Sequence, residues 1–142
     1  MKKLFLFASA VILSATVFAQ GQKTADVIKF KELTYDFGKI KQGAPVSHDF
    51  VFTNIGNSPI IIESAMASCG CTTPVKPEGA IQKGKDDKIT AGFNAAVAGA
   101  FTKNIDVKVA GTDGVLSLKI TGEVLTPDAY AKYEASIGKS GR

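Results

Sequence analysis

The sequence has no tryptophan, a single histidine and only two cysteines, and these scarcities exclude several kinds of active site. A structural zinc site usually takes four His or Cys ligands. A serine hydrolase needs a histidine base, an acidic partner and a nucleophile elbow. His48 has no such elbow and falls on the alternating face of an expected strand, where a structural histidine is commoner than a ligand. The carboxylates are dispersed, so we expect no enzyme and no catalytic residue.

The sequence also lacks an apolar run long enough to cross a membrane. The apolar stretch at residues 4–17 is interrupted by two serines and a threonine, whereas a transmembrane helix needs about 18 or more apolar residues. A basic start, Met1-Lys2-Lys3, precedes this stretch, and the small residue Ala19 follows it. This pattern is typical of a secretory signal peptide, residues 1–19, cleaved after Ala19. No cysteine lies there for lipid attachment, so we expect a periplasmic or secreted protein without a membrane anchor after cleavage.

The sequence also lacks a large net charge. The formal net charge is +4, from 17 basic and 13 acidic residues, and it falls further when Lys2 and Lys3 leave with the signal peptide. The basic residues are scattered singly, whereas a nucleic-acid footprint clusters them on one face. We therefore expect no nucleic-acid partner and a protein or other envelope component instead.

The rest of the chain is long enough for one domain with its own core but not comfortably for two. Residues 20–26 are polar and patternless, so we expect a disordered leader there and the domain at residues 27–125. Apolar and polar residues alternate through much of the domain, which is typical of half-buried strands. The runs are 27–30, 35–38, 46–53, 60–63, 89–93, 101–109 and 116–124.

About seven such strands, joined by turn residues with no helical pattern between them, predict an all-β, antiparallel immunoglobulin-like β-sandwich. A small barrel is the alternative. The lack of tryptophan and of two well-separated cysteines argues against an antibody-type domain. We expect runs 46–53 and 60–63 to pair as a hairpin, and residues 74–84, which contain Pro and Gly, to cross the surface irregularly.

Residues 126–142 form a C-terminal tail that begins with a helix signal. Thr126 is a possible N-cap, and Pro127 suits the first helical position. An isolated helix shorter than about a dozen residues is marginal in water. We therefore expect a short helix that frays or docks weakly.

A set of residues in fixed order carries a family resemblance. The residues are Asp36-Phe37-Gly38, Gly43, Phe50, Phe52, Asn54, Gly56, Pro59, Ser68-Cys69-Gly70-Cys71-Thr72, Gly84, Phe93, Gly99 and Phe101. With them the chain resembles the bacterial domain-of-unknown-function 1573 family over nearly all of residues 28–124. The resemblance implies an exported immunoglobulin-like domain, similar to ASH-type and major-sperm-protein-like sandwiches, and no activity, because the family has none assigned.

Cys69 and Cys71 are separated only by Gly70, and three interpretations remain open. The first is a disulfide that shapes the loop, because an exported chain meets an oxidising compartment. Closing so short a loop stabilises the fold by about 1.6 kcal/mol at best. We expect Gly70 to supply a turn conformation that lets the sulfur atoms meet.

The second interpretation is a thiol redox site that exchanges with partner disulfides. The third is a Cu(I) site formed by two thiolates and the thioether of Met66. We expect the cysteine loop at one end of the sandwich, with Cys69 and Cys71 close together and partly reachable from solvent. We also expect the hydroxyl groups of Ser68 and Thr72 to bond its backbone.

Overall fold

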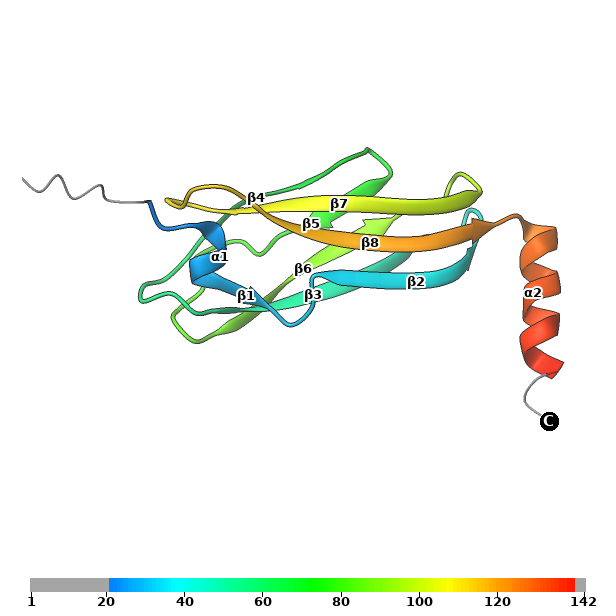
Figure 1. Ribbon diagram of the computed structural model, residues 1–142, viewed down its shortest axis with the longest axis horizontal. Coiled ribbons are helices and arrows are strands. Elements are labelled where there is room, and N and C mark those ends of the chain that lie inside the picture. Colours follow the sequence, from blue (N-terminus) through cyan, green and yellow to red (C-terminus); the bar gives the residue numbers. More distant parts are fainter. Residues whose placement is uncertain (1–20, 140–142) are drawn as a thin grey trace, which may run out of the picture.

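The computed structural model describes residues 21–139, so the expected signal peptide lies outside the described residues. Its strands pack as two sheets face to face, with the long axis horizontal in Figure 1. The elements are α1 (Thr24–Val27), β1 (Ile28–Phe30), β2 (Thr34–Lys41), β3 (Val46–Asn54), β4 (Ile62–Ala67), β5 (Thr72–Val75), β6 (Asp86–Phe93), β7 (Gly99–Val109), β8 (Leu116–Leu125) and α2 (Pro127–Lys139). One sheet has the order β1-β3-β6-β5 and the other β2-β8-β7-β4. The expected all-β immunoglobulin-like sandwich is confirmed.

The pairing of the strands differs from the expectation in two places. The expected hairpin is wrong, because β3 pairs with β1 and β6 while β4 pairs with β7 in the opposite sheet. Between β3 and β4 the backbones of Ile60 and Ile81 bond to each other, which holds the chain in a crossing from one sheet to the other. In addition, β2 and β8 run parallel, whereas the other neighbouring strands run antiparallel.

The core lies between the two sheets and follows the alternation seen in the sequence. Phe50 and Phe52 of β3 are fully buried, while Val51 between them is half-buried on the opposite face of the strand. Complete burial of one such side chain contributes roughly 1.5–3 kcal/mol. The opposite sheet supplies the facing layer, formed by Ile105, Val107, Val109, Leu118, Ile120 and Val124.

One end of the sandwich is closed by a buried asparagine. Asn54 is 1% exposed, and its amide nitrogen donates to the carbonyls of Ser58 and Ile81, each at 2.9 Å. Its side-chain oxygen accepts from the Gly56 N–H at 2.9 Å. Since a buried amide that loses its partners is costly, this network fixes the chain where it passes between the sheets.

The same end is covered by α1, and here the structure differs from the expected disordered leader. Thr24 is buried, its hydroxyl donates to the Gly114 carbonyl at 2.9 Å, and its N–H donates to the Asp113 carbonyl at 3.1 Å. The segment is ordered because its polar groups bond to the turn between β7 and β8. We call α1, the Asn54 network and this turn the closed end.

The expected short C-terminal helix is present as α2, which projects from the other end of the sandwich (Figure 1). The Thr126 hydroxyl accepts from the Ala129 N–H at 3.4 Å, as expected of an N-cap. The Lys39 ammonium lies 5.0 Å from the centre of the Tyr133 ring. Residues 134–138 are exposed, so α2 docks only through its first half.

Candidate functional site

Cys69 and Cys71 lie in the loop from β4 to β5, where the chain passes between the sheets. Their Cα atoms are 5.4 Å apart, and the structure joins their sulfur atoms in a disulfide. Both residues are half-buried and Gly70 is exposed. The pair is therefore close together and partly reachable from solvent, as expected.

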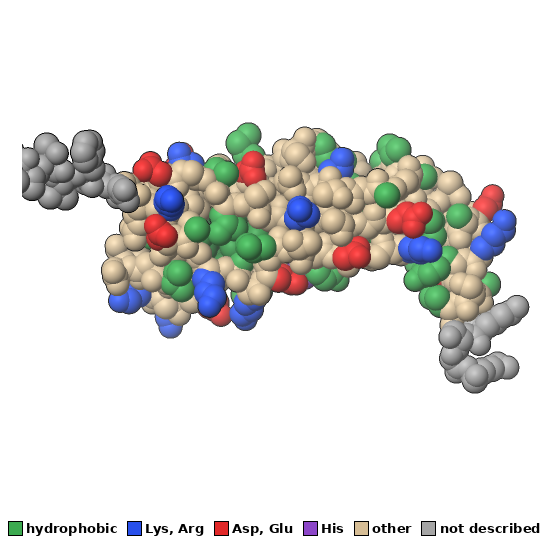
Figure 2. All heavy atoms as spheres, viewed as in Figure 1, with side chains coloured by type: hydrophobic (Ala, Val, Ile, Leu, Met, Phe, Trp, Pro, Cys, Tyr) green, Lys and Arg blue, Asp and Glu red, His purple; other side chains and the backbone are tan. Residues whose placement is uncertain are grey.

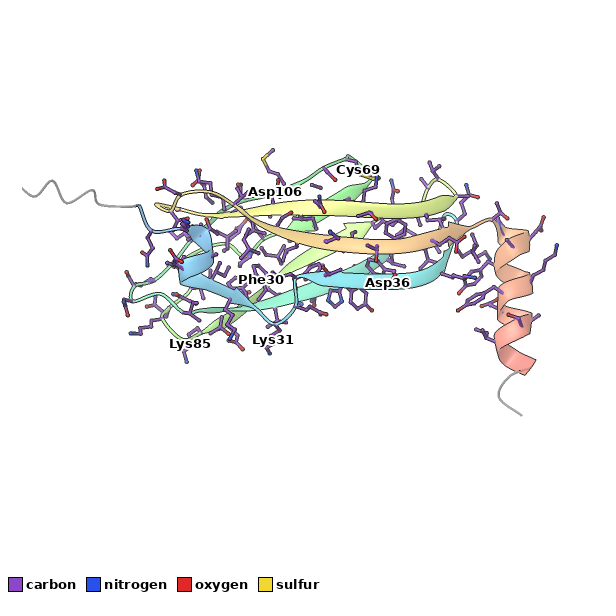
Figure 3. The ribbon with its side chains drawn as sticks, in the orientation of Figure 1. Phe30, Lys31, Asp36, Cys69, Lys85 and Asp106 are labelled. Atoms are coloured by element: carbon purple, nitrogen blue, oxygen red, sulfur yellow. A yellow bond between two sulfur atoms is a disulfide. The ribbon has the colours of Figure 1, made fainter. Side chains whose placement is uncertain are left out.

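The loop lies along a lateral margin of the sandwich, where Figure 3 labels Cys69, and the expectation of a position at the end is wrong. The N–H of Ser68 donates to the Asn104 carbonyl at 3.0 Å, the last backbone bond between this margin and β7. Residues 99–103 of β7 extend past that point, and we call them the β7 overhang. The loop is lateral because β4 is shorter than β7.

The loop is ordered differently from the sequence expectation. Gly70 is not among the glycines with positive φ, and a Cβ there would meet nothing within 4 Å, so no special conformation of Gly70 is needed. The buried Thr72 hydroxyl lies 3.8 Å from the sulfur of Cys69 and 3.9 Å from that of Cys71. Because disulfide sulfurs carry no hydrogen, Thr72 is the donor. The Ser68 hydroxyl instead accepts from the Asn104 N–H at 3.3 Å.

The outer edge of β5 offers no free N–H at Thr72 or Pro74 to an added strand. The Asn94 N–H donates to the Cys71 carbonyl at 3.1 Å. Because hydrogen bonding alternates along an antiparallel pair, the backbone N–H and C=O positions of Thr72 and Pro74 face away from β6. The Thr72 N–H is already donated to the Cys69 carbonyl at 3.3 Å, and Pro74 has no N–H. Residues 74–75, the start of the segment we expected to be irregular, therefore belong to a strand, because proline is tolerated at an edge, whereas residues 76–84 form no regular element, as expected.

The β7 overhang, in contrast, has unpaired backbone groups. The backbone carbonyl of Asn104 faces β4. Because backbone groups alternate along a strand, the N–H and C=O of Ala100 and Thr102 face the same side. No strand among residues 21–139 pairs with them there. A strand in line with β4 would fill this position.

Beside these groups lies a hollow of about 470 Å³, which we call the overhang hollow. Its floor includes Phe93 of β6 and Phe101 of β7, whose rings stack with centroids 4.0 Å apart, and Cys71 borders it. Val97 and Lys103 also line it. Volumes of this order are typical of ligand sites, and the apolar floor next to unpaired backbone can accept an extended chain with an apolar side chain.

The far rim of the hollow is fixed by residues 94–98. Ala95 is fully buried, and its carbonyl accepts from the Gly43 N–H at 2.9 Å. The side-chain nitrogen of Gln42 donates to the Ala96 carbonyl at 3.0 Å. The rim is thus held by the turn after β2, and the hollow is formed before any partner arrives.

A second hollow, of about 480 Å³, lies between β4 and β5 and is lined by Met66 and Cys69. Met66 is 69% exposed. Unpaired backbone of Ala65 and Ala67 faces it, but no aromatic ring lines it. A Cu(I) site here would require the reduced loop, because soft metals bind thiolates. Within residues 21–139 no cluster of three or more His, Cys, Asp or Glu is arranged to hold a metal ion.

His48 takes part in a stacked arrangement between the sheets, as expected of a structural histidine. Its ring lies on that of Tyr35, with centroids 3.6 Å apart, and its Nε2 is 2.8 Å from a carboxylate oxygen of Glu32. Next to it on β3, hydrogen bonds from Lys88 and then Thr90 lower the pKa of Asp49. These contacts join β3 to its neighbours β2 and β6.

Sequence reasoning found the cysteines but missed Ala100, Thr102 and the aromatic floor. The available signal was the difference in length between the runs at 60–63 and 101–109, because two paired strands of unequal length leave an overhang.

Charged side chains of both signs are scattered over the face in Figure 2. None of the helices in the described part of the chain could span a membrane.

Comparison with known proteins gives one family and several structural relatives. The model of a family described as "Protein of unknown function (DUF1573)" matches residues 28–124. No curated protein gives a significant match. A protein of unknown function from Porphyromonas gingivalis W83 is similar in structure, with a TM-score of 0.61 and 15% identity over 78% of this chain and 51% of that one. This chain therefore spans about half the length of that protein.

Two further structures share the fold. The ASH/PapD-like domain 7 of human CEP192 has a TM-score of 0.57 and 8% identity, over 85% of this chain and 98% of that one. The Vibrio cholerae VesB protease has a TM-score of 0.55 and 14% identity, over 72% of this chain and 33% of that one. At these identities the likeness shows the fold alone.

Proposed function

The chain belongs to the DUF1573 family, and from that premise we propose that it is an exported, non-enzymatic binding module. In this proposal the domain holds an extended segment of another protein by pairing with it along the β7 overhang. The segment would add a strand in line with β4.

One observation carries the proposal: β7 has unpaired backbone at Ala100 and Thr102, and Ala100 borders a preformed apolar hollow. In strand addition, main-chain hydrogen bonds provide affinity, and pockets for alternate side chains provide selectivity. Lys103 is the one titratable side chain among the residues that line the hollow. A lone ammonium with no acid–base partner supports binding rather than proton-transfer chemistry.

Export is supported by the start of the sequence and by the disulfide, since disulfides persist in oxidising compartments. The mass of the mature protein recovered from the periplasm or medium tests this part of the proposal. We expect a chain that begins at Gln20. Full-length protein confined to the cytoplasm would contradict export.

The binding role is tested by photo-crosslinking in the native cell. A photoreactive residue at Val97, which is 78% exposed on the rim of the hollow, should crosslink to a discrete envelope protein. Val115, which is 56% exposed at the closed end, is the matched control and should give no such product.

The variant Ala100→Pro then locates the contact. It removes an N–H on the open side of β7 and no bond to β8, so the domain should fold while the Val97 product disappears. Identical products from both positions, or a Val97 product that persists in a folded Ala100→Pro variant, would exclude strand addition at the overhang.

A thiol-exchange role is the second candidate, favoured by the half-buried Cys71 at the border of the hollow. A partner thiolate would attack one sulfur, form a mixed disulfide and release the other as a thiolate. Thiol titration after mild reductant tests it: resistance to reduction removes both the redox and the Cu(I) hypotheses. If the thiols become free, stoichiometric anaerobic Cu(I) binding that Cys69→Ser abolishes would support the metal site.

A further inference from the structure

Lys103 is placed unusually for a lysine on this sandwich. Along β7 the side chains of the odd-numbered residues point to the interior, where those of Ile105, Val107 and Val109 are buried. The side chains of Phe101 and Lys103 continue this row and line the hollow. Lys103 is half-buried, and within residues 21–139 it forms no salt bridge. A positive charge therefore borders the hollow without a negative partner.

The register of an added strand follows from the β7 backbone. A segment that pairs with Ala100 and Thr102 has one residue directly opposite Phe101, and that side chain shares the interior face. Its next side chain on this face is two residues along, because side chains alternate in a strand. That second position lies opposite Lys103, and Ser68 occupies the place beyond it, opposite Asn104.

We propose that the overhang hollow selects an extended protein segment in which a bulky apolar residue stands two positions from an acidic residue. The apolar side chain covers Phe93, Phe101 and the Cys71 sulfur, and the carboxylate pairs with Lys103. This inference rests on the proposed function and names the chemistry of its partner.

The two interactions differ in strength. An apolar side chain that leaves water for the hollow gains about tenfold or more in affinity. An opposite-charge pair across two strands contributes about two- to fivefold, because it remains partly solvated. The apolar residue therefore anchors the segment, and the acidic residue discriminates between candidates.

Titration of capped synthetic peptides tests the inference, with amide NMR of the folded, oxidised protein as the readout. The reference peptide alternates threonine and serine and carries phenylalanine and, two residues later, glutamate; a second peptide carries the same pair in reverse order. The better of the two should shift the amide signals of Ala100 and Thr102. Replacing its phenylalanine by alanine should weaken binding about tenfold, and replacing its glutamate by glutamine about two- to fivefold.

Lys103→Gln is the matched protein variant, and it should fold because the lysine has no ion partner to lose. It should bind the glutamate and glutamine peptides equally, and Lys103→Glu should prefer a lysine peptide. Equal affinity of the unmodified protein for all peptides, lost in Ala100→Pro, would overturn this inference and leave the proposed function intact. If no peptide shifts Ala100 or Thr102, or the shifts map to another edge, both are wrong. A concentration-dependent dimer that shifts the same amides without peptide would instead identify a second copy of the chain as the occupant and overturn the inference.

Discussion

The closed end and the margin at the Cys69–Cys71 loop, which we call the loop margin, differ in how their backbone groups are hydrogen-bonded. At the closed end, Asn54 alone satisfies two carbonyls and an N–H, and Thr24 bonds the turn after β7. At the loop margin, β4 stops before β7 does, and no strand within residues 21–139 pairs with Ala100 and Thr102 on the side away from β8. The two regions belong to one sandwich but differ in whether their backbone groups are paired.

This contrast separates stability from recognition. Buried polar groups with full sets of hydrogen bonds hold a fold because each lost partner is costly. Unpaired groups at the surface are solvated, cost the fold little and remain free for a partner. In our proposal, the closed end therefore stabilises the domain and the loop margin binds the partner.

The largest expected effect comes from Asn54→Ala, which strips hydrogen bonds from two carbonyls and an N–H at the closed end. We expect a loss of about 3 kcal/mol in the free energy of unfolding, measured by urea denaturation. The matched variant is Asn94→Ala at the loop margin, where the side chain accepts one exposed bond from Ala96. It should cost less than about 1 kcal/mol. Equal losses would break the comparison.

An intermediate effect is expected from the double variant Cys69→Ser/Cys71→Ser. The disulfide closes a very short loop, so its removal should lower the free energy of unfolding by at most about 1.6 kcal/mol. The unmodified protein in reductant serves as the control and should reach the same value. A variant that cannot fold would show that the loop margin is as important for stability as the closed end.

The smallest effect concerns Asp49, on the outward face of β3. Its pKa is lowered chiefly by the hydrogen bond from Lys88, so the folded state binds the proton less readily than the unfolded state. The carboxylate therefore stabilises the fold above the unfolded pKa of about 3.9, and this contribution is lost as the pH falls through the folded value. With the Asp49 side chain 43% exposed, we expect less than about 1 kcal/mol.

Urea denaturation at neutral and acidic pH, with Asp49→Asn beside the unmodified protein, measures this contribution. The variant should lose less stability on acidification, and Lys88→Met should resemble it, since it removes the main hydrogen-bond donor to Asp49. Parallel losses in all three proteins would show that the pair contributes nothing.

Local sequence pattern was sufficient for most strands and for the fold class. Alternation placed Phe50 and Phe52 in the core, and Thr126 with Pro127 marked the start of α2, because these signals depend on neighbouring residues. Partners distant in sequence were not predictable. The order of α1 depends on Asp113 and Gly114, and β4 pairs with β7 rather than with β3.

The candidate site shows the same division. The two cysteines were evident as a motif, and their closeness followed from their spacing. The hollow was not evident, because Phe93 and Phe101 read as ordinary strand residues and meet only when β6 and β7 face each other. Pro74 suggested an irregular segment, yet its position at an edge allowed a strand.

The parallel pairing of β2 with β8 imposes an order of events on folding. Thr34 pairs with Lys119 and Lys41 with Leu125. The backbone hydrogen bonds of β2 therefore form only when β8, the last strand of the chain, is present. Such non-local contacts form late, because the intervening chain must first be closed into a loop. In a chain emerging from a ribosome, the backbone groups of β2 therefore lack their ladder partner until β8 has been synthesised.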